Sequence, residues 1–106
     1  MIIYVDIDET ICYYGDKREY DLASPIKENI QKINTLYDEG NTIVYWTARG
    51  SQTGIDWTNL TTHQLKKWRA KYHNLILKKP HYDLFICDKA INSNVFFNEE
   101  GEDEKS

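Results

Sequence analysis

Two carboxylates stand two residues apart near the start of the chain. Asp6 and Asp8 follow the apolar run 2–5, whose β-branched and aromatic side chains predict a short buried strand. Residues two apart in extended backbone point to the same side, so both carboxylates would occupy one small volume. Because two such charges repel unless a cation or proton lies between them, the pair favours a magnesium site. Turn residues that end a strand would give the same short pattern.

Polar residues also end three later apolar runs. Thr47 ends the run 41–47, Lys79 follows the run 75–77 and Asp88 follows the run 84–87. In parallel sheets, ligands bind beyond the carboxyl ends of the strands, so we expect these side chains to meet the two aspartates in one pocket. A hydroxyl, a lysine and a magnesium ion held by carboxylates together bind a phosphoryl group. One aspartate could attack phosphorus while the other transfers a proton.

The elements that must position these residues alternate between strands and helices. The apolar spacing predicts helices over about 26–39 and 59–72, a flap-like hairpin over about 11–21, and a fifth strand or edge over 94–97. Ser24 and Pro25 have the residue types of a helix cap and a first helical position. Since the strands lack strict alternation, we expect an α/β fold whose mostly parallel sheet is covered on both faces.

Composition and charge narrow the functional classes. A chain of 106 residues with 41% hydrophobic residues predicts a single folded domain. It has no apolar run that could span a membrane and no signal-peptide pattern, so we expect a cytoplasmic protein. Residues 99–106 form an acidic tail that we expect to be disordered, and residues 1–98 carry 12 acids and 12 bases. A neutral core with an acidic tail argues against nucleic acid as a partner.

The candidate residues resemble, in order, the four motifs of the haloacid dehalogenase superfamily of phosphotransferases. The matching segments are Asp6-Ile7-Asp8-Glu9-Thr10, Thr47, Lys79-Pro80 and Asp88, and the resemblance covers about residues 2 to 97. It implies a Rossmann-like three-layer core with Asp6 as nucleophile and Asp8 as general acid/base. It also implies that Mg²⁺ is held by the Asp6 carboxylate, the Asp8 backbone carbonyl and Asp88. Thr47 and Lys79 would bind the phosphoryl group.

Three segments further resemble the small phosphatases of capsule and other surface-polysaccharide synthesis: 45–50, 54–57 and 88–92. This resemblance implies a small phosphorylated metabolite, most simply a sugar phosphate, as substrate. Arg49, Ser51 and Lys89 would then contact its leaving group, although surface-loop residues would follow the same pattern.

Two positions depart from the family pattern. Glu9 stands where metabolite phosphatases usually have glycine, and Cys87 precedes Asp88 where an acidic residue is frequent, which predicts weaker metal binding. The short loops leave no room for a cap domain, so the flap, a second subunit of a homo-oligomer or a large substrate would exclude water. Two alternatives stay open. One is a phosphatase of macromolecules, either nucleic-acid 3′ ends or phosphoproteins, and the other is a catalytically weak metal-binding protein of the same fold.

Overall fold

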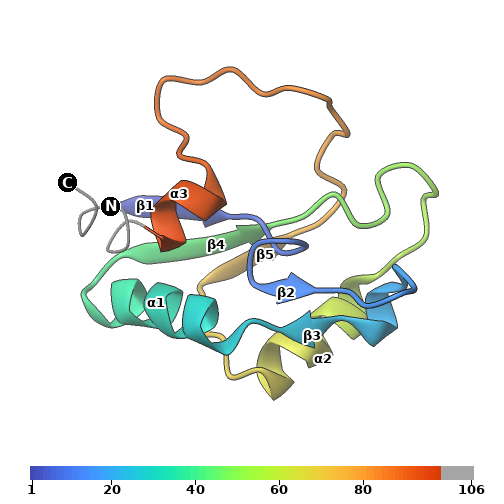
Figure 1. Ribbon diagram of the computed structural model, residues 1–106, viewed down its shortest axis with the longest axis horizontal. Helices are drawn as coiled ribbons and strands as arrows, with labels where there is room; N and C mark the ends of the chain where they lie inside the picture. The colour runs from blue at the N-terminus through green and yellow to red at the C-terminus, as the bar shows by residue number, and fades with distance from the viewer. Residues whose placement is uncertain (99–106) are drawn as a thin grey trace.

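A parallel sheet of three strands lies at the centre of the computed structural model, which describes residues 1–98 (Figure 1). The strands are β1 (Ile2–Val5), β4 (Thr42–Trp46) and β5 (Asn74–Ile76), in the spatial order β1-β4-β5. The pairing places Val5 beside Tyr45 and Tyr45 beside Leu75. All three strands therefore end at one edge of the sheet, where the sequence predicts the site. The described chain is a compact α/β fold with this sheet and three α-helices.

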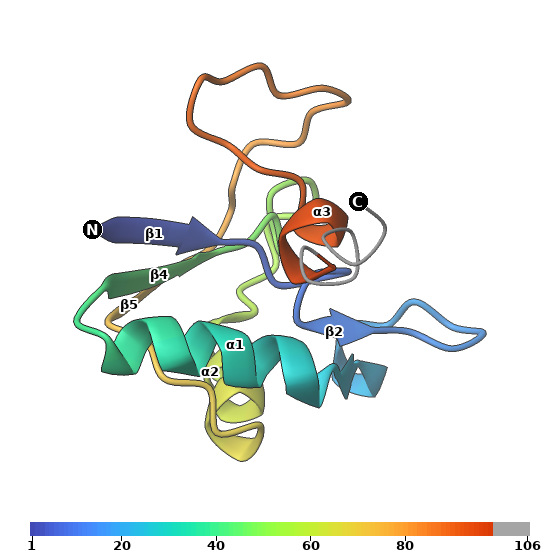
Figure 2. The same cartoon turned by 60° about the vertical axis from the view of Figure 1, so that its left-hand side comes forward.

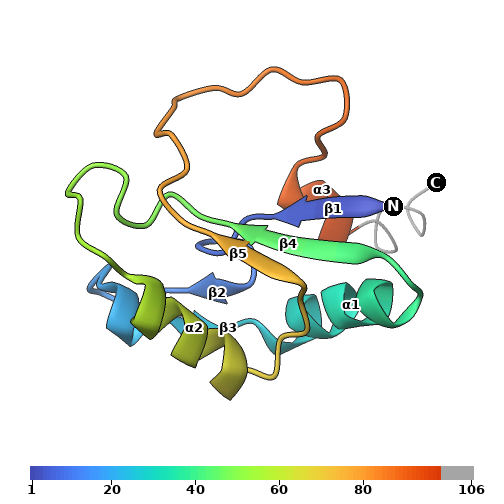
Figure 3. The same ribbon diagram turned by 180° about the vertical axis from the view of Figure 1, so that it is seen from behind.

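Two of the helices pack on the same face of the sheet. They are α1 (Lys27–Asp38) and α2 (Thr58–Lys67), which lie together below the strands (Figure 3). The core between these layers contains Val5, Ile43 and Tyr45 from the sheet, Ile30 and Ile33 from α1, and Leu65 from α2. Burying each such side chain contributes roughly 1.5–3 kcal/mol. No helix within residues 1–98 is long and apolar enough to cross a membrane.

The opposite face of the sheet is more open than expected. Ile2 and Tyr4 alternate with the core residues of β1, and they are 70% and 55% exposed. The prediction of helices on both faces therefore holds for one face within the described residues. The predicted acidic tail, residues 99–106, lies outside them.

A hairpin follows β1, as predicted, but it extends further along the chain. Strand β2 (Cys12–Tyr13) pairs antiparallel with β3 (Ser24–Pro25), and a 3-10 turn η1 (Tyr20–Leu22) lies between them. We call residues 12–25 the flap. The prediction that Ser24 and Pro25 start the first helix is wrong. They pair with β2 instead, and the helix begins after Ile26, whose N–H donates to the Ile11 carbonyl at 2.8 Å.

The last third of the chain differs most from expectation. After β5, residues 77–92 form a long loop that arches away from the sheet (Figure 2). The predicted strand 84–87 is wrong, because no described segment pairs with it and Leu84 and Ile86 stay exposed. The predicted strand 94–97 is a short helix, α3 (Ser93–Phe97). Its start is stabilised by the Asn92 side chain, which accepts the Asn94 N–H at 2.8 Å.

Candidate functional site

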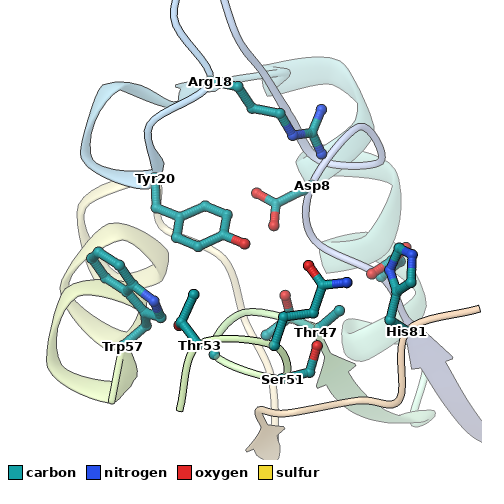
Figure 4. Close-up of a pocket in the computed structure, with 12 residues that line it drawn as sticks. Asp8, Arg18, Tyr20, Thr47, Ser51, Thr53, Trp57 and His81 are labelled. Atoms are coloured by element: carbon teal, nitrogen blue, oxygen red, sulfur yellow. The ribbon is translucent and has the colours of Figure 1, made fainter. Parts of the chain in front are cut away.

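A pocket of about 370 Å³ opens at the carboxyl edge of the sheet. Four segments supply its walls: the loop after β1, the flap, the loop after β4, and the loop after β5. From these come, among others, Asp6, Asp8, Arg18, Tyr20, Thr47 and Ser51. Figure 4 shows the Asp8 carboxylate, the Tyr20 ring and Thr47 around the same space. The structure thus brings both predicted aspartates, the predicted threonine and the predicted serine to one pocket.

The Asp6 carboxylate lies on the open side of this pocket. Its Oδ1 accepts the Ile7 N–H at 3.0 Å. Surrounding protein atoms displace water from it and raise its pKa above the usual range, while the positive charge of Lys79 acts in the opposite direction. Asp6 therefore keeps a carboxylate oxygen free toward the pocket, as a nucleophile or a metal ligand requires.

The chain reverses direction at Glu9, just after Asp8. Glu9 has a φ of 65°, in the left-handed region that glycine adopts freely and other residues rarely do. Its N–H donates to the Cys12 carbonyl at 3.0 Å. This tight turn sends the flap back past Asp8, so that the side chains of Cys12 and Tyr14 reach the Asp8 carboxylate.

Asp8 is held by four donors from three side chains. Arg49 donates through Nη2 to Oδ1 at 2.8 Å and through Nε to Oδ2 at 3.2 Å. The Tyr14 hydroxyl donates to Oδ1 at 2.5 Å, and the Cys12 thiol lies 3.5 Å from the same oxygen. Burial raises the pKa of Asp8, but the hydrogen bonds and charge of Arg49 outweigh it, and the pKa lies below its usual range. Asp8 is therefore a fixed, ionised carboxylate.

Arg49 does not face the substrate space, so its predicted contact with a leaving group is wrong. The residue is fully buried. Besides its two bonds to Asp8, its Nη1 donates to Thr61 at 3.1 Å and to Gln64 at 2.6 Å, and its guanidinium lies 4.7 Å from the Tyr20 ring centroid. Sequence reasoning placed it in a surface loop because the two helical acceptors come from α2, which is remote in sequence. Its role is to orient Asp8.

Thr47 and Lys79 lie next to each other at the strand ends. The Lys79 N–H donates to the Thr47 carbonyl at 2.9 Å. The Lys79 ammonium lies 4.8 Å from the centroid of the Trp46 ring. It is also near enough to Asp6 for its positive charge to act to lower the pKa of that carboxylate. Thr47 is buried, and its side chain forms part of the pocket wall. Thr47 therefore lines the pocket with Asp6, whereas Lys79 acts on the Asp6 charge from nearby without lining the pocket.

Asp88 and Lys89 are not part of this arrangement. Both lie exposed in the loop 77–92 and do not line the pocket. Within residues 1–98, no three acidic, histidine or cysteine side chains are close enough together to hold a metal ion. The predicted metal set of Asp6, Asp8 and Asp88 is therefore not assembled in the described chain. The physical reason is that the run 84–87 does not pair with β1 and so does not carry Asp88 to the sheet edge.

The donor set present fits a partial magnesium site. Asp6 offers one open carboxylate, whereas the carboxylate of Asp8 is occupied by Arg49. Mg²⁺ is often bound by one or two carboxylates together with water and substrate phosphate oxygens. The single carboxylate of Asp6, together with oxygens of a bound phosphate, would be the smallest ligand set of this kind.

Several pocket residues, among them Arg18, Tyr20 and His81, were missed by sequence reasoning. The Tyr20 and Trp57 rings pack edge to face with their centroids 5.1 Å apart, and Arg18 and His81 also line the pocket (Figure 4). Gly50 makes the turn that returns the chain toward Trp57, because its φ is +83° and a Cβ would lie 2.4 Å from the Ile55 carbonyl oxygen. Only the position of His81, just after Lys79-Pro80, was a usable signal in the sequence.

The comparisons with known proteins bear on the fold. No protein-family model matches the sequence, and no curated protein matches it either. A crystal structure of a genomics target from Vibrio cholerae is similar, with 25% sequence identity and a TM-score of 0.79. The similarity covers 98% of this chain and 97% of that chain. The similarity extends over the whole α/β architecture. The name of that structure states no activity.

Proposed function

We propose that this protein is a phosphomonoester hydrolase with a capless, Rossmann-like α/β core, acting through an aspartyl-phosphate. The observation that carries the proposal is the Asp6 carboxylate at the pocket, with Thr47 in the same pocket wall, Lys79 near enough for its charge to act on Asp6, and Asp8 fixed two residues further along. Four predicted residues from three strand ends meet at one edge of a parallel sheet, where ligands of such sheets bind. A chance cluster of turn residues does not explain this convergence.

The chain's own residues supply the two displacement steps. An Asp6 oxygen attacks phosphorus, and the bond from phosphorus to the leaving alkoxide oxygen breaks. A water molecule then attacks the phosphorus of the aspartyl-phosphate, which releases inorganic phosphate and the Asp6 carboxylate. Thr47 and Lys79 bind phosphoryl oxygens. The lowered pKa keeps Asp8 ionised, so Asp8 accepts a proton from the attacking water, as a weaker base than a free carboxylate, and the leaving alkoxide takes its proton from solvent.

We further propose Mg²⁺ as the cofactor, bound by Asp6 together with the substrate's phosphate. Bound there, the ion would screen the repulsion between the carboxylate and the phosphate. With no third protein carboxylate nearby in residues 1–98, we expect metal binding to be weak until a phosphate is bound. This dependence is measurable as magnesium binding with and without a phosphate ester.

The pocket walls favour a sugar phosphate as the substrate. Beyond the carboxylates, the walls combine the aromatic rings of Tyr20 and Trp57 with the hydroxyl and amide groups of Ser51, Gln52 and Thr53. Apolar ring faces with convergent hydrogen-bonding groups suit a small polar metabolite. Because the pocket is open, we also propose that a second copy of the chain or the flap excludes water in a cytoplasmic enzyme.

Hydrolysis of an aryl phosphate, with and without Mg²⁺, tests the proposal. We expect turnover that Asp6→Asn abolishes, because the amide is not a nucleophile toward phosphorus. Asp38→Asn is the matched control, since this exposed carboxylate pairs with Lys71 at the surface and such pairs contribute little to stability. Equal activity of wild type and Asp6→Asn would refute the mechanism.

A substrate panel separates the alternatives. It compares sugar phosphates with 3′-phosphorylated oligonucleotides and phosphopeptides, at several magnesium concentrations. Preference for a macromolecular substrate would overturn the sugar-phosphate assignment. An absence of turnover with every ester would favour the catalytically weak alternative.

A further inference from the structure

Gln64 joins the flap to the residue that orients Asp8. This side chain is buried on α2, and its Oε1 accepts the Arg49 Nη1 hydrogen bond at 2.6 Å. Its Nε2 donates to the Tyr20 carbonyl, in the flap, at 2.5 Å. One side-chain amide therefore connects the flap backbone to Arg49 and, through Arg49, to the Asp8 carboxylate.

The chemistry of the two partners demands an amide at this position. A guanidinium has only donors, and a backbone carbonyl has only acceptors. The bridging side chain must therefore accept on one side and donate on the other, which among side chains of this length only glutamine does. Glutamate would keep the bond to Arg49 but would turn a carboxylate oxygen toward the Tyr20 carbonyl. Methionine has a similar volume and would make neither bond.

The flap loop is fastened at both of its ends. At one end the Tyr14 hydroxyl donates to Asp8, and at the other the Tyr20 carbonyl accepts from Gln64. Arg49 contacts both attachments, because it donates to Asp8 and to Gln64 and lies within 3.4 Å of the Tyr14 hydroxyl. Arg18, between the two fastened ends, faces the pocket together with Tyr20 (Figure 4). The position of this pocket wall therefore depends on the two attachments.

We infer that Gln64 is a positioning residue that latches the flap onto α2 and thereby fixes the flap wall of the pocket. The latch is a property of the fold, and only its effect on turnover rests on the proposed function. Loss of the latch frees Tyr20 and Arg18 to move away from the pocket. The catalytic carboxylate keeps its bonds to Arg49, so substrate binding weakens more than the chemical step.

Amide hydrogen exchange of the flap tests the latch without any assay of activity. The reporters are the N–H groups of Leu22 and Ala23, which donate to the Glu19 and Tyr20 carbonyls within η1. In Gln64→Glu we expect these two amides to exchange about tenfold faster, since the hydrogen bond from the Gln64 amide is lost and a carboxylate oxygen faces the Tyr20 carbonyl in its place. The Ile43 amide in the core strand β4 should not change. Gln31→Glu adds the same charge at an exposed site on α1 and is the matched control.

Two further measurements keep the inference open to refutation if the buried glutamate prevents folding. Gln64→Met carries no charge and should show the same faster exchange in the flap. In the wild-type protein, the side-chain amide protons of Gln64 should exchange at least about tenfold more slowly than those of exposed Gln31. The inference would be overturned if hydrogen exchange of the Leu22 and Ala23 amides were unchanged in a folded variant. It would also be overturned if the side-chain amides of Gln64 and Gln31 exchanged at the same rate.

Turnover supplies the functional readout. For an aryl phosphate, Gln64→Glu should raise KM about tenfold and leave kcat within about twofold of wild type. A fall in kcat with unchanged KM would contradict the role in the pocket wall. Inactive wild-type protein would refute the proposed function while leaving the exchange result to decide on the latch.

Discussion

Replacing Arg49 with methionine should destabilise the protein severely. The guanidinium is fully buried and the side chain of its partner, Asp8, is 14% exposed. Removing one member of a buried ion pair costs about 3–5 kcal/mol, because the other charge is left without compensation. A domain of this size has roughly 5–15 kcal/mol of stability, so the variant should lose a large part of it. Methionine fills much of the vacated volume, so the loss reports the missing charge and hydrogen bonds rather than a cavity.

Urea denaturation measures this loss. With a slope of about 2 kcal/mol per molar, a loss of 4 kcal/mol lowers the unfolding midpoint by about 2 M. The double variant Asp8→Asn, Arg49→Met removes both charges and should be more stable than Arg49→Met alone. With Asp8→Asn alone as the other single variant, a coupling free energy of about 1 kcal/mol or more in this double-mutant cycle would assign the loss to the ion pair.

The pH dependence of this loss has a definite sign. In the wild type the pKa of Asp8 is lowered, so its contribution is present above the unfolded-state pKa, about 4, and is lost as the pH falls through the folded-state pKa. In Arg49→Met the largest remaining influence on the pKa of Asp8 is burial, which raises it, while the hydrogen bonds from Tyr14 and Cys12 still act to lower it. The variant therefore binds a proton more readily than its unfolded chain does and recovers stability as the pH falls.

The difference between the two proteins should accordingly be largest near pH 7 and should shrink toward about pH 4. A loss below about 1 kcal/mol at neutral pH would refute the reasoning. So would a loss that is the same at both pH values, because the missing partner would then not be the cause.

Two other substitution and labelling experiments test the loop after β4 and the turn after β1. Gly50→Ala should cost roughly 1–3 kcal/mol in urea denaturation, because φ is +83° and the new Cβ would meet the Ile55 carbonyl oxygen at 2.4 Å; Gly15→Ala, where nothing lies within 4 Å, is the control. Burial raises the pKa of the Cys12 thiol to about 12, whereas Cys87 is exposed. A thiol reagent at about pH 8 should therefore modify Cys87 alone in the folded protein and both cysteines after unfolding. Rapid labelling of Cys12 in the folded state would contradict its place beside Asp8.

Local patterns in the sequence determined the central strands and the open half of the site. The apolar run before Asp6 predicted β1, the run 41–47 predicted β4, and the helical spacing after Ile26 predicted α1. Because parallel strands end at one sheet edge, β1 and β4 were enough to bring Asp6, Asp8 and Thr47 together, and the run 75–77, which predicted β5, brings Lys79 beside Thr47. This part was predictable because each signal lies within one element.

Tertiary structure decided which residues are buried around those side chains. Arg49 follows a strand in a polar loop, and only the packing of α2 turns it inward onto Asp8. Likewise Pro25 pairs with β2 instead of starting a helix, and the apolar run 84–87 has no strand beside it. Burial and strand pairing depend on partners remote in the sequence, so periodicity and residue type within a segment do not specify them.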